Sequence, residues 1–129
     1  MSKSIRQSVT IKASPHAVYE ALMDPKKHGD FTGGEAKISR KVGGKFSISG
    51  GDIEGENLEL VPDQKIVQSW RYSDWEPEVY SRATFALKAA GEKTKLTFTQ
   101  SGVPDEHYEE IKQGWIDYYW GPMKEMLEK

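Results

Sequence analysis

Three histidines are the first residues whose type suggests chemistry. His16, His28 and His107 stand far apart in the sequence and form no HExxH motif and no pair at positions i and i+4. The chain has no cysteine that could complete a zinc site with them. All three have polar neighbours, which favours solvated surface positions. The sequence therefore predicts exposed histidines and no metal site.

Carboxylates alternate in the stretch DIEGE, where Asp52, Glu54 and Glu56 fall on one face of an expected strand. They could hold a cation, but carboxylates on an exposed sheet face are far more common than cation ligands. A catalytic pair would need one carboxyl group with a raised pKa inside a closed pocket, and no acidic residue can be placed in one. We therefore expect no catalytic residue in this chain.

Glycine-rich motifs for nucleotide or acyl chemistry are also missing. Eight of the twelve glycines fall between Gly29 and Gly55, but they match neither GxxxxGKS/T nor GxGxxG, and no GxSxG motif occurs. Turns and bulges explain most of these glycines. We predict no cofactor and no enzymatic activity.

Four large aromatics fall within six positions of the stretch GWIDYYW, from Trp115 to Trp120. They could stack on bases, anchor the chain in a membrane, line a ligand pocket or fill the core. Twenty acidic against eighteen basic side chains give a net charge of -2, whereas grooves for nucleic acid are basic. No apolar run reaches the roughly 18 residues of a membrane span, and MSKSIRQSVTIK has no signal-peptide core. We expect a soluble, cytoplasmic protein with no nucleic-acid or membrane partner.

The elements that position these residues follow from hydrophobic periodicity. Residues 5–11 alternate apolar and polar side chains, which predicts a strand with one buried face. A short helix then begins at Pro15, behind the N-cap residue Ser14. Residues 24–34 mix proline, glycine and charge, so we expect a broken helix or a loop there, anchored by Phe31.

The middle of the chain is expected to form an antiparallel meander. Turn signals divide it at positions 43–44, 50–51, 62–63 and 91. Within the strands, alternation assigns these side chains to the inward face: Phe46, Ile48, Ile66, Trp70, Tyr72, Val79, Ala83, Phe85, Leu87, Leu96 and Phe98. The alternation changes phase between Ile53 and Leu58, so we expect a bulge near Gly55.

A long amphipathic helix is predicted from Pro104 to Leu127. Gly114 lies inside this helix at a cost of about 1 kcal/mol relative to alanine, so we expect another group to approach it closely. Pro122 removes a backbone donor and should kink the helix.

The aromatic run cannot place all its side chains on one face of this helix, because consecutive positions turn by about 100 degrees. Trp115, Tyr118 and Tyr119 are expected to face the sheet, and Trp120 to lie toward an edge. The aromatic run is thus expected to belong mainly to the core.

The order of elements predicts an α+β architecture for residues 1–129 as a single domain, with a curved antiparallel sheet of about six to seven strands around a long C-terminal helix. Two short helices lie between the first and second strands. A gap between sheet and helix would form a hydrophobic cavity. Its walls are predicted to be Phe46, Ile48, Trp70, Phe85, Phe98, Ile111 and Trp115, with Gln68, Arg82 and Gln100 available to orient a guest.

Trp75, in the stretch SDWEPE, has little local core to join. It either folds back over the mouth of the cavity or marks a rim that contacts a partner protein. Phe31 is the second candidate for this partner-contact rim.

Several stretches resemble the activator of heat-shock protein 90 ATPase family in its C-terminal-type domain. They are YEALMDPKKHGDFT, VGGKFSISGGDIEGENLELVPDQKIVQSWR, Trp75 with the pair Tyr80-Ser81, TKLTFTQSGVP and GWIDYYWGPMKEML, and together they span roughly residues 10–127. The resemblance implies the helix-grip, START-like fold. In the two-domain eukaryotic co-chaperones of this family, an N-terminal domain binds the middle segment of the chaperone, and the C-terminal domain engages its ATP-binding domains.

The resemblance implies a non-enzymatic, co-chaperone-like adaptor that binds heat-shock protein 90, modulates its ATPase cycle and serves the stress response. The sequence has no counterpart of the N-terminal domain, so strong ATPase stimulation is not expected. Single-domain relatives with this fold often bind small apolar molecules. A second hypothesis is therefore a carrier or sensor of a small hydrophobic ligand held between the sheet and the C-terminal helix.

Overall fold

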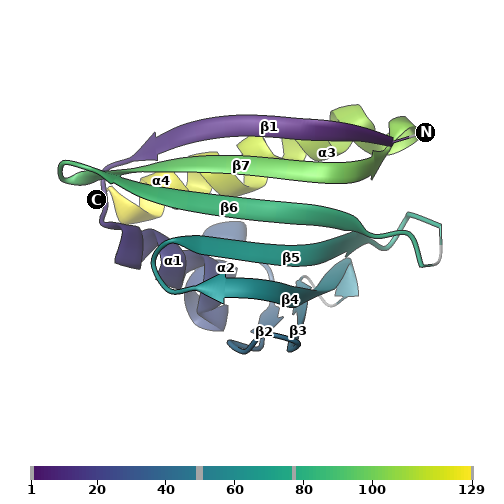
Figure 1. Ribbon diagram of the computed structural model, residues 1–129, viewed down its shortest axis with the longest axis horizontal. Coiled ribbons are helices and arrows are strands. Elements are labelled where there is room, and N and C mark those ends of the chain that lie inside the picture. Colours follow the sequence, from purple (N-terminus) through teal and green to yellow (C-terminus); the bar gives the residue numbers. More distant parts are fainter. Residues whose placement is uncertain (1, 49–50, 77, 129) are drawn as a thin grey trace.

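Seven antiparallel strands form one curved sheet in the part of the chain that the computed structural model describes, residues 2–48, 51–76 and 78–128 (Figure 1). In chain order they are β1 (Ser2–Ile11), β2 (Ala36–Ile38), β3 (Lys45–Ile48), β4 (Ile53–Val61), β5 (Lys65–Tyr72), β6 (Ser81–Ala90) and β7 (Lys93–Pro104). The strands from β2 to β7 pair in sequence order, and β1 completes the sheet by pairing with β7. The predicted meander is confirmed.

Two short helices, α1 (Pro15–Met23) and α2 (Pro25–Thr32), connect β1 to β2. The Ser14 hydroxyl caps α1 by accepting a hydrogen bond from the Ala17 N–H at 3.1 Å, as the sequence indicated. Asp24 caps α2 by accepting from two backbone N–H groups of its first turn. The Asp24 cap and Pro25 at the first helical position together stabilise the start of α2. The segment predicted as a broken helix or loop is therefore a regular helix.

The C-terminal helix changes its hydrogen-bonding pattern along its length. It consists of a 3-10 turn, η2 (Asp105–His107), then α3 (Tyr108–Gly114), a π-helical segment, η3 (Trp115–Trp120), and α4 (Gly121–Leu127). Pro122 lacks the N–H that an α-helix would direct to the Tyr118 carbonyl, and the wider π turn gives the proline ring room. The irregularity expected at Pro122 is thus a π segment in the turn before it.

The π segment determines which aromatics face the sheet. Trp115, Tyr119 and Trp120 are buried, whereas Tyr118 is 66% exposed. The prediction that Tyr118 faces the sheet is therefore wrong, whereas Trp120 lies toward the β1 edge as expected and is buried there. Each residue of a π segment turns the chain by less than the α-helical value of about 100 degrees, so positions i, i+4 and i+5 share one face.

Strand β4 contains a bulge, but not near Gly55. Gly55 pairs in regular register, and the register shifts between Asn57 and Glu59, so that Leu58 is the additional residue. A Cβ atom on Gly55 would lie 1.8 Å from the Ser69 carbonyl oxygen. This glycine therefore allows two strands to approach closely, and it does not interrupt their pairing.

The helices lie together on one side of the sheet, and the hydrophobic core fills the space between the two layers (Figure 1). Most strand positions that the sequence assigned inward are buried there: Phe46, Ile48, Ile66, Trp70, Ala83, Phe85, Leu87, Leu96 and Phe98. At the β1 edge, the Trp120 Nε1–H donates to Gln7 Oε1 at 2.6 Å, and Gln7 Nε2 donates to the Lys112 carbonyl at 3.0 Å. The predicted α+β, helix-grip arrangement is confirmed.

Candidate functional site

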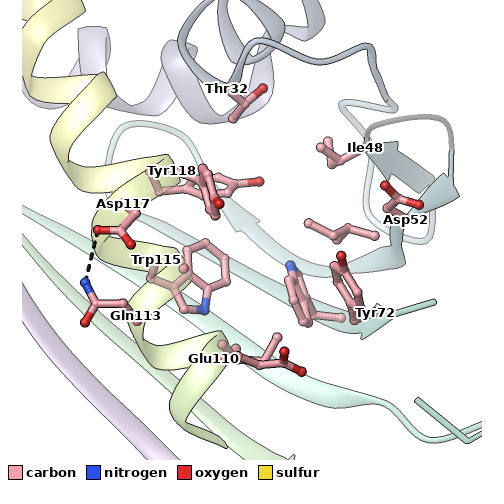
Figure 2. A pocket seen from close by; sticks show the side chains of 14 residues that line it. Thr32, Ile48, Asp52, Tyr72, Glu110, Gln113, Trp115, Asp117 and Tyr118 are labelled. Atoms are coloured by element: carbon pink, nitrogen blue, oxygen red, sulfur yellow. Dashed lines mark hydrogen bonds between the residues drawn. The ribbon is translucent and has the colours of Figure 1, made fainter. Parts of the chain in front are cut away.

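A groove of about 610 Å³ opens where α3 and η3 pass one end of the sheet (Figure 2). Fourteen residues line it, contributed by the end of α2, by β3, β4 and β5 at one end of the sheet, by the turn before β4, and by the helix. Adjacent antiparallel strands bring their ends to a common edge, so positions far apart in sequence meet at this groove. Its size lies within the range of small-molecule sites.

Buried apolar side chains form the floor of the groove. Trp70 lies on the inward phase of β5, and its ring centroid is 5.6 Å from that of Trp115. Ile111 lies four residues before Trp115, so both helix residues face the sheet. Ile48 and Tyr119, both buried, complete this apolar surface. Such large rings provide most of the contact area that an apolar guest can use.

A chain of hydrogen bonds fixes Trp115 in place. Its Nε1–H donates to Gln100 Oε1 at 2.7 Å, and Gln100 Nε2 donates to Ser81 Oγ at 2.8 Å. The Ser81 hydroxyl donates to the Trp70 carbonyl at 2.9 Å. The helix indole is thereby tied to β7, β6 and β5 in succession. Rotating it would leave buried polar groups unpaired, so the groove floor is rigid.

The three polar residues expected to orient a guest do not reach the groove. Both ends of the Gln100 amide are used in the chain of bonds just described. Arg82 is exposed on the outer face of β6. Gln68 donates to Asn57 Oδ1 at 3.1 Å and faces a separate inner cavity. The polar groups at the groove come from other positions.

Carboxylates and tyrosine hydroxyls form the rim. Asp52 precedes β4, while Glu110 and Asp117 lie seven residues apart on the helix, where two turns return to the same face. Burial raises the pKa of the Tyr72 hydroxyl, and nearby carboxylates, among them Asp52 and Glu110, raise it further. Tyr118 is the exposed aromatic of this rim. The mouth of the groove is therefore negative.

The inner space between helix and sheet is almost filled. A cavity of only about 10 Å³ remains, enough for about one water. Of the predicted cavity residues, Ile48, Trp70, Ile111 and Trp115 line the groove, while Phe46 and Phe85 line the inner cavity and not the groove. Phe98 lines neither and packs on Trp115 at 4.3 Å between ring centroids. The ligand role of these residues remains a prediction.

His28 is buried, which corrects the prediction that every histidine is exposed. Its Nδ1 lies 3.0 Å from the Leu22 carbonyl, which only accepts, so Nδ1 carries the proton and Nε2 accepts from the Tyr119 hydroxyl at 2.8 Å. Burial lowers the pKa of His28 and raises that of Tyr119. The available signal was the i, i+3 spacing from His28 to Phe31, which places both on one face of α2.

The two candidates for a partner-contact rim are also buried. Phe31 packs against His28 and Tyr119, with ring centroids 5.1 Å and 5.5 Å away. Trp75 folds back onto Trp70 at 5.4 Å, which is one of the two placements that the sequence allowed. Its buried Nε1 has no hydrogen-bond partner among the residues that the structure describes. Neither ring offers an exposed contact surface in this structure, and their role as a partner-contact rim remains a prediction.

Gly114 lies on the wall of the groove. A Cβ atom there would meet only the Tyr118 ring, at an ordinary contact distance of 3.8 Å. The expected close approach is therefore wrong, and glycine is not required by packing. Its effect is to leave the wall of the groove without a side chain next to Trp115.

Over residues 2–48, 51–76 and 78–128, no group of three or more histidine, cysteine, aspartate or glutamate side chains could hold a metal ion. Glu54, on the expected carboxylate face, forms an ion pair with Arg71 at 3.8 Å. Among the same residues no helix is long and apolar enough to cross a membrane.

Comparison with known proteins shows similarity to a family that is named after activators of the Hsp90 ATPase. The family model described as Activator of Hsp90 ATPase homolog 1-like protein matches residues 12–128. A Dictyostelium discoideum protein named as an activator of the 90 kDa heat-shock protein ATPase is 32% identical over 88% of this chain, and a human homolog 1 is 29% identical over 90%. These matches cover 30% and 34% of the two relatives, so the chain spans about a third of their length.

A solved structure of an HSP90 activator from Plasmodium falciparum has the same fold, with a TM-score of 0.91 and 28% sequence identity. The match covers 97% of this chain and 96% of that chain. The similarity therefore extends over both the sheet and the C-terminal helix.

Proposed function

This chain belongs to the Activator of Hsp90 ATPase homolog 1-like family, and from that premise we propose that it is a co-chaperone-like adaptor that binds heat-shock protein 90 in the cytoplasm. In this proposal the chain performs no chemistry of its own and modulates the ATPase cycle of the chaperone. The observation that carries the proposal is the family match over residues 12–128. The relatives are named as activators of an ATPase, not as enzymes themselves.

An exposed surface on η3 is the best candidate for the chaperone contact. Ile116, Asp117 and Tyr118 are consecutive exposed residues, and Ile116 and Tyr118 are 44% and 66% accessible. Large exposed apolar side chains favour protein contacts, and tyrosine is enriched at interfaces. We place the contact here because Phe31 and Trp75 lie inside the core.

An adaptor accelerates the cycle only if it binds the closed state of the chaperone more tightly than the open state. A second attached domain strengthens binding through effective concentration, by about 100-fold or more. The named activators are about three times as long as this chain. We therefore expect the chain alone to bind with micromolar or weaker affinity and to stimulate turnover modestly.

The test measures ATP turnover by the cognate heat-shock protein 90 during titration with this protein. Chemical-shift mapping on the labelled protein locates the contact. Ile116→Ala and Tyr118→Ala should each reduce stimulation, whereas Val42→Ala, which changes a 62% exposed apolar residue elsewhere, should not. The proposal fails if turnover and shifts stay unchanged at high protein excess with nucleotide present.

A second candidate is a carrier or sensor of a small hydrophobic ligand. The groove of about 610 Å³ with its floor of tryptophan and isoleucine favours this function. The inner cavity of about 10 Å³ is too small for such a guest, so the ligand would occupy the groove. Mass spectrometry of the natively purified protein and titration with an apolar probe test it, and a clean unliganded mass with no saturable binding would contradict it.

A further inference from the structure

The groove combines an aromatic floor with a rim that carries only one sign of charge. Among its fourteen lining residues, Asp52, Glu110 and Asp117 are acidic, and none is lysine, arginine or histidine. A site for a neutral lipid gains nothing from three carboxylates, and an anionic guest is repelled by them. The negative rim therefore favours apolar ligands that carry a positive charge over neutral or anionic ones.

The carboxylates flank the aromatic side chains from different elements. Figure 2 shows Asp52 on the sheet side of the groove, with Glu110 and Asp117 on the helix side. A cation above the floor would have negative charge on both sides. Because the elements are fixed to one another by the core, this arrangement exists before any guest binds, and preorganisation favours affinity.

Most of this negative charge is not neutralised inside the protein. Asp52 and Asp117 form no ion pair within the described part of the chain. Asp117 Oδ1 accepts a hydrogen bond from Gln113 Nε2 at 3.0 Å, which orients the carboxylate without removing its charge. Glu110 Oε1 lies 2.6 Å from His107 Nδ1, and this contact leaves Oε2 available.

The aromatic rings of the groove suit a cation as well. Trp70, Tyr72, Trp115 and Tyr118 all line it, and the faces of indole and phenol rings attract cations. Quaternary ammonium groups are recognised by such sets of rings. The hydrogen bond that holds Trp115 keeps at least one ring in a fixed position.

We propose that this groove binds a small organic cation, an amine or quaternary ammonium group attached to a flat apolar body, with the body on the Trp70–Trp115 floor and the charge at the carboxylate rim. The inference specifies the ligand of the carrier hypothesis and does not depend on the chaperone contact.

A matched pair of probes tests the charge requirement. Benzyltrimethylammonium and neopentylbenzene have the same shape, but only the first is charged. Indole resonances of the labelled protein should shift saturably with the cation, with at least tenfold weaker binding of the neutral isostere, and benzoate should not bind. Binding of the cation should weaken with added salt, because the carboxylates are exposed.

Matched variants then assign the effect to the rim. Asp52→Asn and Asp117→Asn should each lower the affinity for the cation by about two- to fivefold, and together by about tenfold. Neither change should alter the affinity for the neutral probe. Glu125→Gln removes one exposed charge elsewhere on the helix and should leave binding unchanged. Unfolding curves for each variant ensure that the comparison concerns folded protein.

Three results would overturn the proposal. Equal affinity for both isosteres would show a simple hydrophobic site, and no saturable binding of either would show that the groove is not a ligand site. Binding of a lysine-rich peptide without binding of the small cation would make it a protein docking surface. ATP turnover of the chaperone is measured separately, so a wild-type protein that binds the cation but does not stimulate turnover would contradict only the adaptor function.

Discussion

The two ends of the contact between helix and sheet are filled very differently. Toward β1 and β7, Trp120 bonds to Gln7 and Phe98 packs on Trp115 with 4.3 Å between ring centroids, so this end is closed by side chains. Toward the ends of β4 and β5, the same helix leaves a groove of about 610 Å³. Trp115 belongs to both regions. One side chain thus supports the closed end and provides the floor of the open end.

The largest effect should come from removing this shared side chain. Trp115→Ala deletes a buried indole and should cost about 3–5 kcal/mol of unfolding free energy, a large share of the stability of a domain of this size. Thermal and urea unfolding measure it. Tyr118→Ala, at a 66% exposed position of the same segment, should change stability by less than about 0.5 kcal/mol. A melting temperature of Trp115→Ala within a degree or two of the wild type would show that the closed end does not depend on this ring.

A smaller loss should follow when only the anchor of Trp115 is removed. Gln100→Leu keeps a similar volume but leaves the buried Trp115 Nε1–H without its acceptor, which should cost about 1–3 kcal/mol. A double-mutant cycle with Trp115→Phe, measured by urea unfolding, should give a coupling of about 1 kcal/mol. Additive effects of the two changes would mean that this bond does not hold the groove floor.

The packing of α2 against the helix should also weaken in acid, through His28. Its pKa is lowered in the folded state, so between the unfolded value of 6.5 and the lower folded value the unfolded chain binds more protons. Stability should therefore fall as the pH drops below about 6.5, by at most about 1.4 kcal/mol per pH unit. Urea unfolding of His28→Gln should show a flatter dependence than the wild type. His16 is exposed, so His16→Gln should leave the slope of unfolding free energy against pH unchanged. An unchanged slope in His28→Gln would show that His28 does not cause the loss of stability in acid.

The smallest effect is expected for Gly114→Ala, which should change protein stability and ligand binding at the open end in opposite directions. Gly114→Ala adds a methyl group at a helical position with φ of -59°, so unfolding free energy should rise by up to about 1 kcal/mol. The same methyl group enters the groove wall and should weaken binding of benzyltrimethylammonium. Urea unfolding and the indole titration measure the two quantities. Stabilisation with unchanged binding would show that the wall at Gly114 does not touch the guest.

Alternation was sufficient to predict the inward faces of the strands. Trp70, Phe85 and Phe98 are buried as expected, because in a sheet with one covered face the period of two determines burial directly. The helix cap at Ser14 was also predictable, since it depends on neighbouring residues alone. These features are local, and a single sequence contains them.

The misplaced residues depend on geometry that local pattern does not encode. Tyr118 is exposed because the helix has a π segment, which no periodicity assumed from an α-helix can reproduce. His28 is buried because a tyrosine hydroxyl 91 positions away satisfies its ring. Trp75 joins the core by packing on Trp70 across the turn that follows β5 and on the distant His107. The groove rim likewise combines Asp52 with two distant helix residues.

The pairing of β1 with β7 has a consequence for how the chain folds. Ile5 pairs with Gln100, whereas β4, β5 and β6 pair with strands next to them in sequence. Loop closure over such a long separation is entropically costly, so we expect the central hairpins to form before the sheet gains its first strand. Pulsed hydrogen exchange during refolding would show early protection of β5 and late protection of β1. During synthesis, β1 therefore stays unpaired until β7 has left the ribosome, and its exposed backbone groups can pair with strands of other chains in that interval.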